Sequence, residues 1–410
     1  MNGINPGDTA FVLLSAGLVM LMTPGLALFY GGMVRAKNVL GTIMHSFFIL
    51  GMASVLWALF GYTLAFGPDA GGFIGRLDWL GLRGVGQVPN ADYAANLPHL
   101  AFMIFQCMFA VITPALITGA FAERIKFSGF VLFTALWSLL VYSPVAHWVW
   151  GVGGWIRNLG AMDFAGGTVV HVNAGVAALA AALVVGRRKG YGHDTLVPHN
   201  LPLTVLGAGM LWFGWFGFNA GSALAANGLA ASAFVVTNLA AATAAVAWAV
   251  AEWLHRGKPT TLGAVSGCVA GLVAITPASG FVGPPAAMII GLLAGAVCYG
   301  GVLAKGKLGY DDSLDVVGIH GAGGVLGALL TGVFASRAIN PAGANGILFG
   351  GGASVFAVQA LAVIAIMLYS FAVSFLLLKV VQMTIGLRVP EEDEETGLDL
   401  SQHNEVGYAI

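Results

Sequence analysis

Long apolar segments separated by short polar ones dominate this chain, and they predict a bundle of membrane-spanning helices. A helix needs about 20 mainly apolar residues to cross a bilayer, and the hydropathy pattern gives eleven such segments. They are 8–32, 39–66, 98–122, 127–148, 166–186, 201–220, 228–254, 261–276, 285–304, 316–334 and 350–385. The eighth of them is the weakest. We therefore expect an all-α polytopic membrane protein with eleven transmembrane helices.

The basic residues set the predicted topology. With the N-terminus outside, thirteen Lys and Arg residues fall in inner segments and four in outer ones, which follows the positive-inside rule. The inner residues are Arg35, Lys37, Arg124, Lys126, Arg187, Arg188, Lys189, Arg256, Lys258, Lys305, Lys307, Lys379 and Arg388, and the outer ones Arg76, Arg83, Arg157 and Arg337. No basic residue precedes the first apolar run, so we expect a retained helix rather than a signal peptide. The C-terminus then lies in the cytoplasm, and the protein in the cell (inner) membrane.

Composition excludes several classes of protein. Of the 410 residues, 58% are hydrophobic and 9% charged, against about a quarter charged in soluble domains. A net charge of −1 and the lack of a basic block argue against a nucleic-acid partner. Cys107, Cys268 and Cys298 lack the spacing of a disulfide framework or a zinc site. We expect no cofactor and no metal.

Two of the predicted spans share a local pattern. HVNAGVAALAAAL begins at His171 and HGAGGVLGALLTG begins at His320, and both read His-x-x-(Ala/Gly)-Gly-Val-x-(Ala/Gly). Five spans separate the copies, so the two cross the membrane in opposite directions. Inverted repeats are typical of transporters. We expect a five-plus-five inverted repeat, with halves at about 8–190 and 200–335, followed by a long eleventh helix at about 350–385.

The two aligned histidines are the first candidates for function, because ionisable side chains inside a span are costly. A pseudo-twofold axis would bring His171 and His320 face to face, where they can share a hydrogen bond and pass protons. The alternative is two buried histidines that each bond a backbone carbonyl. No carboxylate or cysteine accompanies them as a catalytic partner, so we expect no enzyme.

Residues near the outer ends of spans three to six form a second set of candidates. Phe105 and Phe109 lie four apart on one helix face and either pack in the core or close a pore entrance. Trp150 belongs to an interfacial aromatic belt or binds a cation by its ring face. Ser222 either caps a helix end or accepts a hydrogen bond from an N–H cation. Asp163 lies about 12 Å of helix rise from the fifth-span histidine, which favours an N-cap role.

Two predicted segments lie outside the spans. Residues 67–97 form the longest outer loop, and residues 386–410 form an acidic tail that contains EEDEETGLDLSQHNEVGY. The composition of the tail alone favours a solvated, disordered end.

Over essentially its whole length the chain resembles the Amt/Rh ammonium transporter family, on its bacterial and archaeal Amt side. The segments that carry the resemblance are TPGLALFYGGMVRAKNVL, DFAGGTVVHVNAG, GWFGFNAGSA and GLDLSQHNEVGY. It implies a homotrimer in the lipid bilayer, with eleven helices and one pore per subunit. Residues 1–385 are then the transmembrane domain, and 386–410 a cytoplasmic regulatory tail that contacts a PII signal protein. Asn404 departs from the family pattern, where a glycine commonly follows the histidine, and Cys107 replaces a smaller residue.

The resemblance also implies roles for the aromatic residues at the outer mouth. Phe109, Trp150 and Ser222 are similar to the family's outer ammonium recruitment site. Phe105 and Phe218 are similar to the two stacked rings that block the pore below that site.

Four further residues match the family's pore. His171 and His320 resemble the twin histidines that line the conduction path, and Trp215 lies beside them. Asp163 resembles the aspartate that supports the outer site. The resemblance therefore assigns a role to each candidate residue.

These features predict ammonium transport. NH4+ is recruited at the outer aromatic site and deprotonated, and NH3 passes the twin histidines, because a bare cation is costly at the bilayer centre. Whether the proton crosses by a separate route stays open. An ammonium sensor (transceptor) and an Rh-type gas channel are the alternatives. We expect no signalling domain after the last span, which disfavours the sensor, and Trp150 and the tail favour the Amt side.

Overall fold

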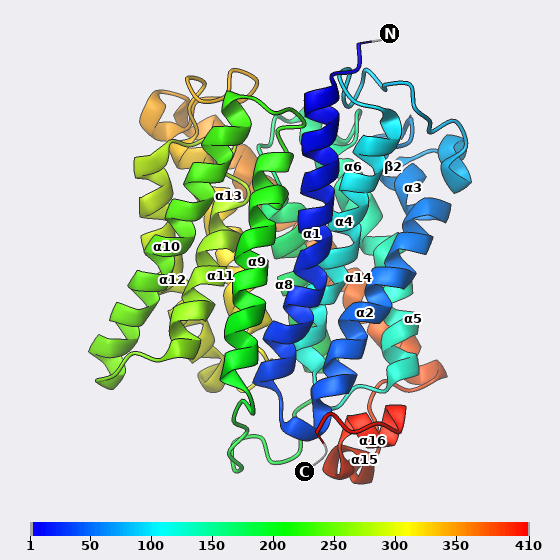
Figure 1. Cartoon of the computed structure of the whole chain (residues 1–410), viewed down its shortest axis with the longest axis vertical. Helices are drawn as coiled ribbons and strands as arrows, with labels where there is room; N and C mark the ends of the chain where they lie inside the picture. The colour runs from blue at the N-terminus through cyan, green and yellow to red at the C-terminus, as the bar shows by residue number, and fades with distance from the viewer. Residues whose placement is uncertain (1–2, 409–410) are drawn as a thin grey trace.

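The computed structural model describes residues 3–408, which form a bundle of long helices standing side by side (Figure 1). Within these residues ten helical segments are long and apolar enough to cross a membrane. They are Pro6–Met33, Ala36–Phe66, His99–Phe121, Phe127–Asn158, Gly167–Val185, Leu201–Gly221, Gly228–Arg256, Pro284–Leu308, Val317–Phe334 and Gly352–Thr384. The apolar helix Thr261–Ile275 has only 15 residues. It lies at the eighth predicted span, which therefore falls short of a full crossing length.

Several of the long segments are composite, with a π-helical or 3₁₀ turn between α-helices. The α-helices are α1 (Pro6–Met33), α2 (Val39–Leu56), α3 (Tyr62–Phe66), α4 (His99–Ile117), α5 (Phe127–Trp137), α6 (Ser143–Trp150), α7 (Trp155–Asn158), α8 (Asn173–Val185), α9 (Leu201–Gly221), α10 (Gly228–Arg256), α11 (Thr261–Ile275), α12 (Pro284–Leu308), α13 (Ala322–Phe334), α14 (Gly352–Thr384), α15 (Glu391–Thr396) and α16 (Leu398–His403). The π-helical turns are η2 (Trp57–Gly61), η5 (Ser138–Tyr142), η6 (Gly167–Val172) and η7 (Val317–Gly321), and the 3₁₀ turns are η1 (Ala36–Asn38), η3 (Leu77–Leu82), η4 (Thr118–Phe121) and η8 (Ile347–Phe349).

The bundle has two ends, which we name by what lies there (Figure 1). The tail face carries α15 and α16, and the N-terminal face carries the start of α1. The predicted outer loop 67–97 lies at the N-terminal face and contains η3 and a short antiparallel hairpin of β1 (Asp69–Ala70) and β2 (Ile74–Gly75).

Small residues allow close helix packing between α1 and α9. A Cβ atom on Gly207 would lie 2.3 Å from the backbone nitrogen of Phe29, and one on Gly32 would lie 2.4 Å from the hydroxyl of Thr204. Both contacts are too short for any side chain. Such close approach of backbones is typical of helices that associate in lipid. It fixes the register of α9, which carries part of the candidate site.

Residues 386–408 of the acidic tail are ordered, and the disorder that the composition favours is wrong for them. Asp399 accepts hydrogen bonds from the backbone nitrogens of Leu40 (3.0 Å) and Gly41 (2.8 Å) at the start of α2. A carboxylate at a helix N-terminus satisfies N–H groups that have no partner inside the helix. Asn404 ends α16 with a φ of 54°, a left-handed conformation that glycine and asparagine adopt most readily. Its departure from the family glycine is therefore compatible with the same turn.

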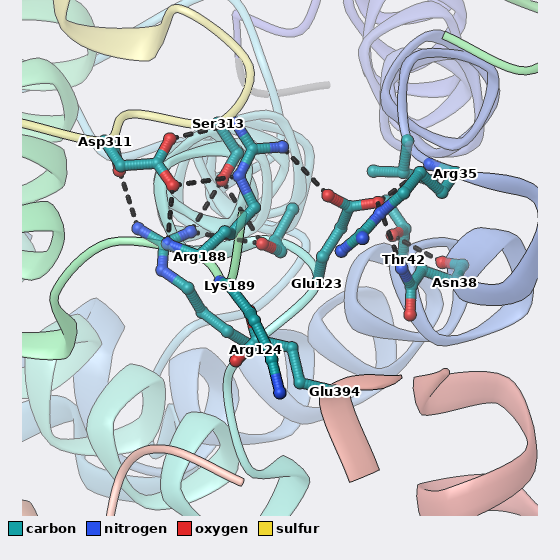
Figure 2. A network of polar contacts seen from close by, with 12 residues as sticks. Arg35, Asn38, Thr42, Glu123, Arg124, Arg188, Lys189, Asp311, Ser313 and Glu394 are labelled. Carbon is teal, nitrogen blue, oxygen red and sulfur yellow. Dashed lines mark hydrogen bonds and ion pairs between the residues drawn. The ribbon is translucent and has the colours of Figure 1, made fainter. Parts of the chain in front are cut away.

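A buried ionic network lies between the tail and the bundle (Figure 2). The carboxylate of Glu123 pairs with Arg35 at 3.0 Å and with Arg188 at 2.8 Å. Arg188 also bonds both oxygens of Asp311, at 2.9 Å each. Burial by itself would raise the pKa of Glu123, but the two guanidinium groups hold that pKa below its usual value. The tail joins this network through Glu394, which accepts from the backbone nitrogen of Lys189 at 2.6 Å.

Candidate functional site

A pocket of about 190 Å³ opens at the N-terminal face. The structure brings the three predicted recruitment residues into its wall, although they come from three separate segments. Its lining residues are Phe66, Asp92, Tyr93, Phe102, Gln106, Phe109, Trp150, Arg157, Phe164, Ser222 and Leu224. Sequence reasoning missed most of the others, because loop residues such as Asp92 and Tyr93 have no periodic pattern that would place them there. The aromatic residues of loop 67–97 were the one feature of the sequence that could have indicated a contribution of this loop to the pocket.

Two hydrogen bonds to backbone oxygens hold the side chains of Trp150 and Ser222 in place at this pocket. The indole nitrogen of Trp150 donates to the backbone oxygen of Asp163 at 2.9 Å. The rings of Trp150 and Phe109 meet edge to face, with centroids 5.8 Å apart and planes at 86°. The hydroxyl of Ser222 donates to the backbone oxygen of Phe218 at 2.9 Å. Its oxygen keeps lone pairs with which it can accept a hydrogen bond.

The pair of rings below the pocket differs from the predicted pair. Phe218 lies against Phe109, with centroids 4.3 Å apart and planes at 41°. Phe105 is instead edge-on to Phe109 at 5.0 Å, and it packs against α9, where a Cβ on Gly221 would lie 2.8 Å from its ring. The prediction that Phe105 and Phe218 form the stacked pair is therefore wrong. Phe109 is both the floor of the pocket and the partner of Phe218.

The two histidines meet below these rings. The Nδ1 atoms of His171 and His320 lie 3.3 Å apart, and the imidazole planes stack within 25°. Trp215 stacks on His171 at 5.4 Å, and its indole donates to the hydroxyl of Thr276 at 2.9 Å. Both imidazoles are nearly fully buried. Among the described residues, the only side-chain hydrogen bond of either imidazole is with the other, and Nε2 of His171 has no partner. Neither ring bonds a backbone carbonyl of residues 3–408.

A narrow cavity of about 10 Å³ adjoins the histidines, barely the space of one water molecule. Apart from the two imidazoles and one indole, its lining is hydrocarbon or thioether. The lining residues are Met22, Leu26, Phe29, Ile112, Leu116, Val170, His171, Leu211, Trp215, Phe218, Val269 and His320. The ring centroids of Phe218 and His171 are 6.1 Å apart. The pocket, the pair of Phe109 and Phe218, and this cavity therefore follow one another in space. A small uncharged molecule suits such surroundings and an ion does not.

Each histidine lies in a π-helical turn whose start is held by an aspartate. Asp163 accepts hydrogen bonds from the backbone nitrogens of residues 166, 167, 168 and 169 at 2.6–3.2 Å. Asp312 accepts from the nitrogen of Val317 at 2.7 Å. Each aspartate stands eight residues before its histidine, and each turn leads into an α-helix of 13 residues. The shared Asp-x₇-His spacing is a sequence signal that could have identified Asp312.

The sequence and structure were compared with known proteins. The profile of the Ammonium Transporter Family matches residues 10–408. An ammonium transporter of Bacillus subtilis (strain 168) is 55% identical over 98% of this chain and 98% of its own length. Saccharomyces cerevisiae Mep2 has a similar crystal structure, with a TM-score of 0.89, 34% identity, and coverage of 95% of this chain and 89% of Mep2. A structure described as a sensor Amt protein has a TM-score of 0.89 at 30% identity and covers 97% of this chain and 98% of its own.

The full-length match and the high identity agree with the apolar helices of the bundle. The sequence resemblance to the Amt side of the family is thereby confirmed, and a multi-pass membrane protein is the consequence. The chain belongs to the ammonium transporter family.

Proposed function

We propose that this chain conducts ammonium along a path that starts at the pocket and passes Phe109, Phe218 and the two histidines. The observation that carries the proposal is the histidine pair. Its two imidazoles are buried, bond only each other among the described residues, and lie beside a narrow apolar cavity. Buried polar groups are normally paired with the protein around them, so an unpartnered nitrogen here suits a substrate that arrives and leaves.

The pocket is the proposed recruitment site. A cation is attracted to the face of an aromatic ring, and most strongly to that of tryptophan. Trp150 offers such a face, and the oxygen of Ser222 accepts one N–H of NH4+. Asp92 and Arg157 in the pocket lining carry opposite charges, so together they add no net charge to the pocket. Phe105 supports this site from behind Phe109 and does not touch the pocket.

The proton is proposed to leave before the apolar section. No acidic side chain lines the cavity beside the histidines, and a charge there would be poorly solvated. NH3 avoids this cost, because it is neutral and can bond an imidazole nitrogen. Sodium and potassium ions cannot lose their charge, so this path excludes them. Transfer of the proton along His171 and His320 is chemically open, since each ring can donate and accept.

The topology is proposed to be eleven crossings, with the N-terminal face outside and the tail face in the cytoplasm of the cell. The count includes the short helix α11, whose N-terminal end follows the exposed polar segment 256–260. The matched aspartates, π-helical turns and 13-residue helices support the five-plus-five inverted repeat, with halves at about 8–190 and 200–335, and α14 follows the second half. The basic residues Arg35, Arg188 and Lys189, which cluster at the tail face, support the orientation.

The assembly and regulation are also proposals. The family resemblance suggests a homotrimer and a PII signal protein that docks on the tail face, to which α15 and α16 would contribute. A sensor role is the second candidate, since one structural neighbour is described as a sensor Amt protein.

Uptake by proteoliposomes tests the proposal. Vesicles that contain the purified, folded protein should take up ammonium faster than protein-free vesicles, and potassium no faster. Equal ammonium uptake with and without protein would overturn conduction and leave the sensor role.

A further inference from the structure

A buried histidine at the N-terminal face contacts two hydrogen-bond acceptors. The imidazole of His147, in the last turn of α6, is fully buried. Its Nδ1 atom lies 2.9 Å from the backbone oxygen of Ala65, and its Nε2 atom lies 2.9 Å from Oδ1 of Asp69. A Cβ atom on Gly151 would lie 2.6 Å from this Nδ1 atom, so the glycine leaves room for the contact with Ala65.

These two contacts need a proton on each ring nitrogen. A backbone oxygen only accepts hydrogen bonds, and so does an ionised carboxylate. A neutral imidazole carries one N–H and can satisfy only one of the two oxygens, whereas an imidazolium donates to both. The hydrogen bond with His147, together with one from the backbone nitrogen of Gly72 at 2.8 Å, holds the pKa of Asp69 below its usual value. The carboxylate of Asp69 therefore stays ionised, and the shared proton belongs to the ring.

The surroundings favour a positive charge on this ring. His147 lies at the C-terminal end of α6 and bonds an oxygen in the last turn of α3, and helix C-termini attract positive charge. The helix α6 packs against α3, η5, α7, η6 and β2. The ionisable side chains on these elements are Tyr62, Tyr142, Arg157 and His171. Tyr62 bonds His99, Arg157 bonds the backbone of Trp150, and His171 bonds His320. Among the described residues, Asp69 is the one charged side chain that pairs with His147.

The contact joins the outer loop to the helix that carries Trp150. Asp69 belongs to β1 of the hairpin, and His147 lies about one helical turn before Trp150. The indole nitrogen of Trp148 makes a further bond between loop and helix, to the backbone oxygen of Phe73 at 2.8 Å. The side chain of Asp69 is 31% exposed and lines a cavity of about 310 Å³ at the same face. The pair can therefore exchange its proton with water.

We propose that His147 is an imidazolium whose ion pair with Asp69 positions Trp150, so that ammonium recruitment depends on the proton of this pair. The inference rests on the proposed recruitment site and adds a positioning residue to it. When the proton leaves at alkaline pH, the lone pairs of Nε2 and Oδ1 face each other across 2.9 Å and repel. The hairpin is then held less firmly to the end of α6, and the indole of Trp150 is less well placed for the cation. The ion pair is thus present at low pH and is lost as the pH rises.

Solid-state NMR of the reconstituted protein with isotope-labelled histidine nitrogens tests the protonation directly. The signals of His147 are those that disappear in His147→Gln. We expect both ring nitrogens to carry protons at about pH 6 and Nε2 to lose its proton as the pH is raised into the alkaline range. A neutral His147 ring at about pH 6 would overturn the proposal.

Uptake into proteoliposomes tests the positioning role. The half-saturating NH4+ concentration of wild type should rise about three- to tenfold, the effect of one lost hydrogen bond, over the pH range in which His147 loses its proton. Asp69→Asn should abolish this rise, because its amide donates to Nε2 of a neutral imidazole and keeps the contact without the extra proton. The matched control is Asp78→Asn, at an exposed carboxylate in η3 of the same loop, which should keep the rise.

Two outcomes of the uptake measurement would overturn the positioning role. One is a half-saturating concentration of wild type that stays constant while His147 titrates, and the other is an undiminished rise in folded Asp69→Asn. Absence of ammonium uptake by folded wild type would instead overturn the proposed function, and the NMR spectra would still decide the charge of His147. The spectra of wild type also keep the proposal testable if Asp69→Asn does not fold.

Discussion

Phe109 contacts three aromatic rings: Phe105 on its own helix, Trp150 on α6 and Phe218 on α9. The four-residue spacing correctly placed Phe105 and Phe109 on one side of α4. Spacing within one helix cannot say which of two rings meets a third ring on another helix. That depends on where α9 is placed relative to α4, and Gly221 on α9 leaves room for the ring of Phe105.

Replacement of Trp150 tests the recruitment site. Trp150→Leu removes the aromatic face and should weaken ammonium recruitment by about 1–2 kcal/mol, so the half-saturating ammonium concentration should rise about 5- to 30-fold. The measurement is uptake into proteoliposomes over a range of ammonium concentrations. Trp253→Leu, at an exposed site on α10, is the control and should behave as wild type. An unchanged half-saturating concentration in Trp150→Leu would remove this residue from the site.

At the scale of the elements, hydropathy could not predict the π-helical turns. The hydropathy of an apolar segment is the same whether its backbone hydrogen bonds follow α or π geometry. The difference arises locally: Asp163 intercepts the first free N–H groups of η6, and Gly166 adopts a φ of 114° before it. The repeated Asp-x₇-His spacing was visible in the sequence, but its meaning depends on a turn that only the structure reveals.

The two capping aspartates should differ in their contribution to stability. Asp163→Asn replaces a carboxylate that accepts from four backbone nitrogens, and a stranded buried donor costs about 1–3 kcal/mol. Asp312 accepts fewer hydrogen bonds and has one unpartnered oxygen, and burial raises its pKa to about 6. We therefore expect Asp163→Asn to lower the thermal midpoint clearly and Asp312→Asn to change it little. The reverse order, measured by thermal unfolding in detergent, would contradict this reading of the turns.

The ionic network at the tail face predicts a dependence of stability on pH. Arg188 and Arg35 hold the pKa of Glu123 below the ordinary value of a glutamate, against the effect of burial. A carboxylate with a lowered pKa adds stability above its unfolded value and loses it as the pH falls through the folded value. Wild type should therefore lose more thermal stability than Glu123→Gln between pH 7 and pH 3.5. Parallel pH profiles of the two proteins would show that the ion pairs add nothing.

At the scale of the whole molecule, the helical bundle could be predicted from the sequence because long apolar segments of a membrane protein form spanning helices. The prediction failed at the tail, because amino-acid composition does not show where each charged residue lies. Asp399 is positioned to cap α2, and Glu394 accepts from the backbone nitrogen of Lys189 at 2.6 Å. These acidic residues thus bind backbone groups that are far away in sequence. Local composition cannot show such pairing.

Removal of the tail tests its proposed regulatory role. Truncation after Arg388 deletes α15 and α16 and all their bonds to α2 and to Lys189. We expect it to abolish binding of a PII protein and to impair or deregulate ammonium uptake. Pull-down with a purified PII protein and uptake by the same preparation measure both effects. Full PII binding by the truncated protein would place the docking surface elsewhere.

The central claim is that His171 and His320 line the path and exclude ions, and current across solid-supported membranes tests it most directly. An acidic side chain fixed in the path can accompany a cation, as charged rings do in channels. We predict that folded His171→Asp or His320→Glu passes potassium, whereas wild type does not. Replacement of both histidines by apolar residues should stop any charge movement coupled to ammonium. Wild-type ammonium current in the folded double variant, together with unchanged exclusion of potassium by the acidic variants, would contradict the claim and return the pair to a structural role.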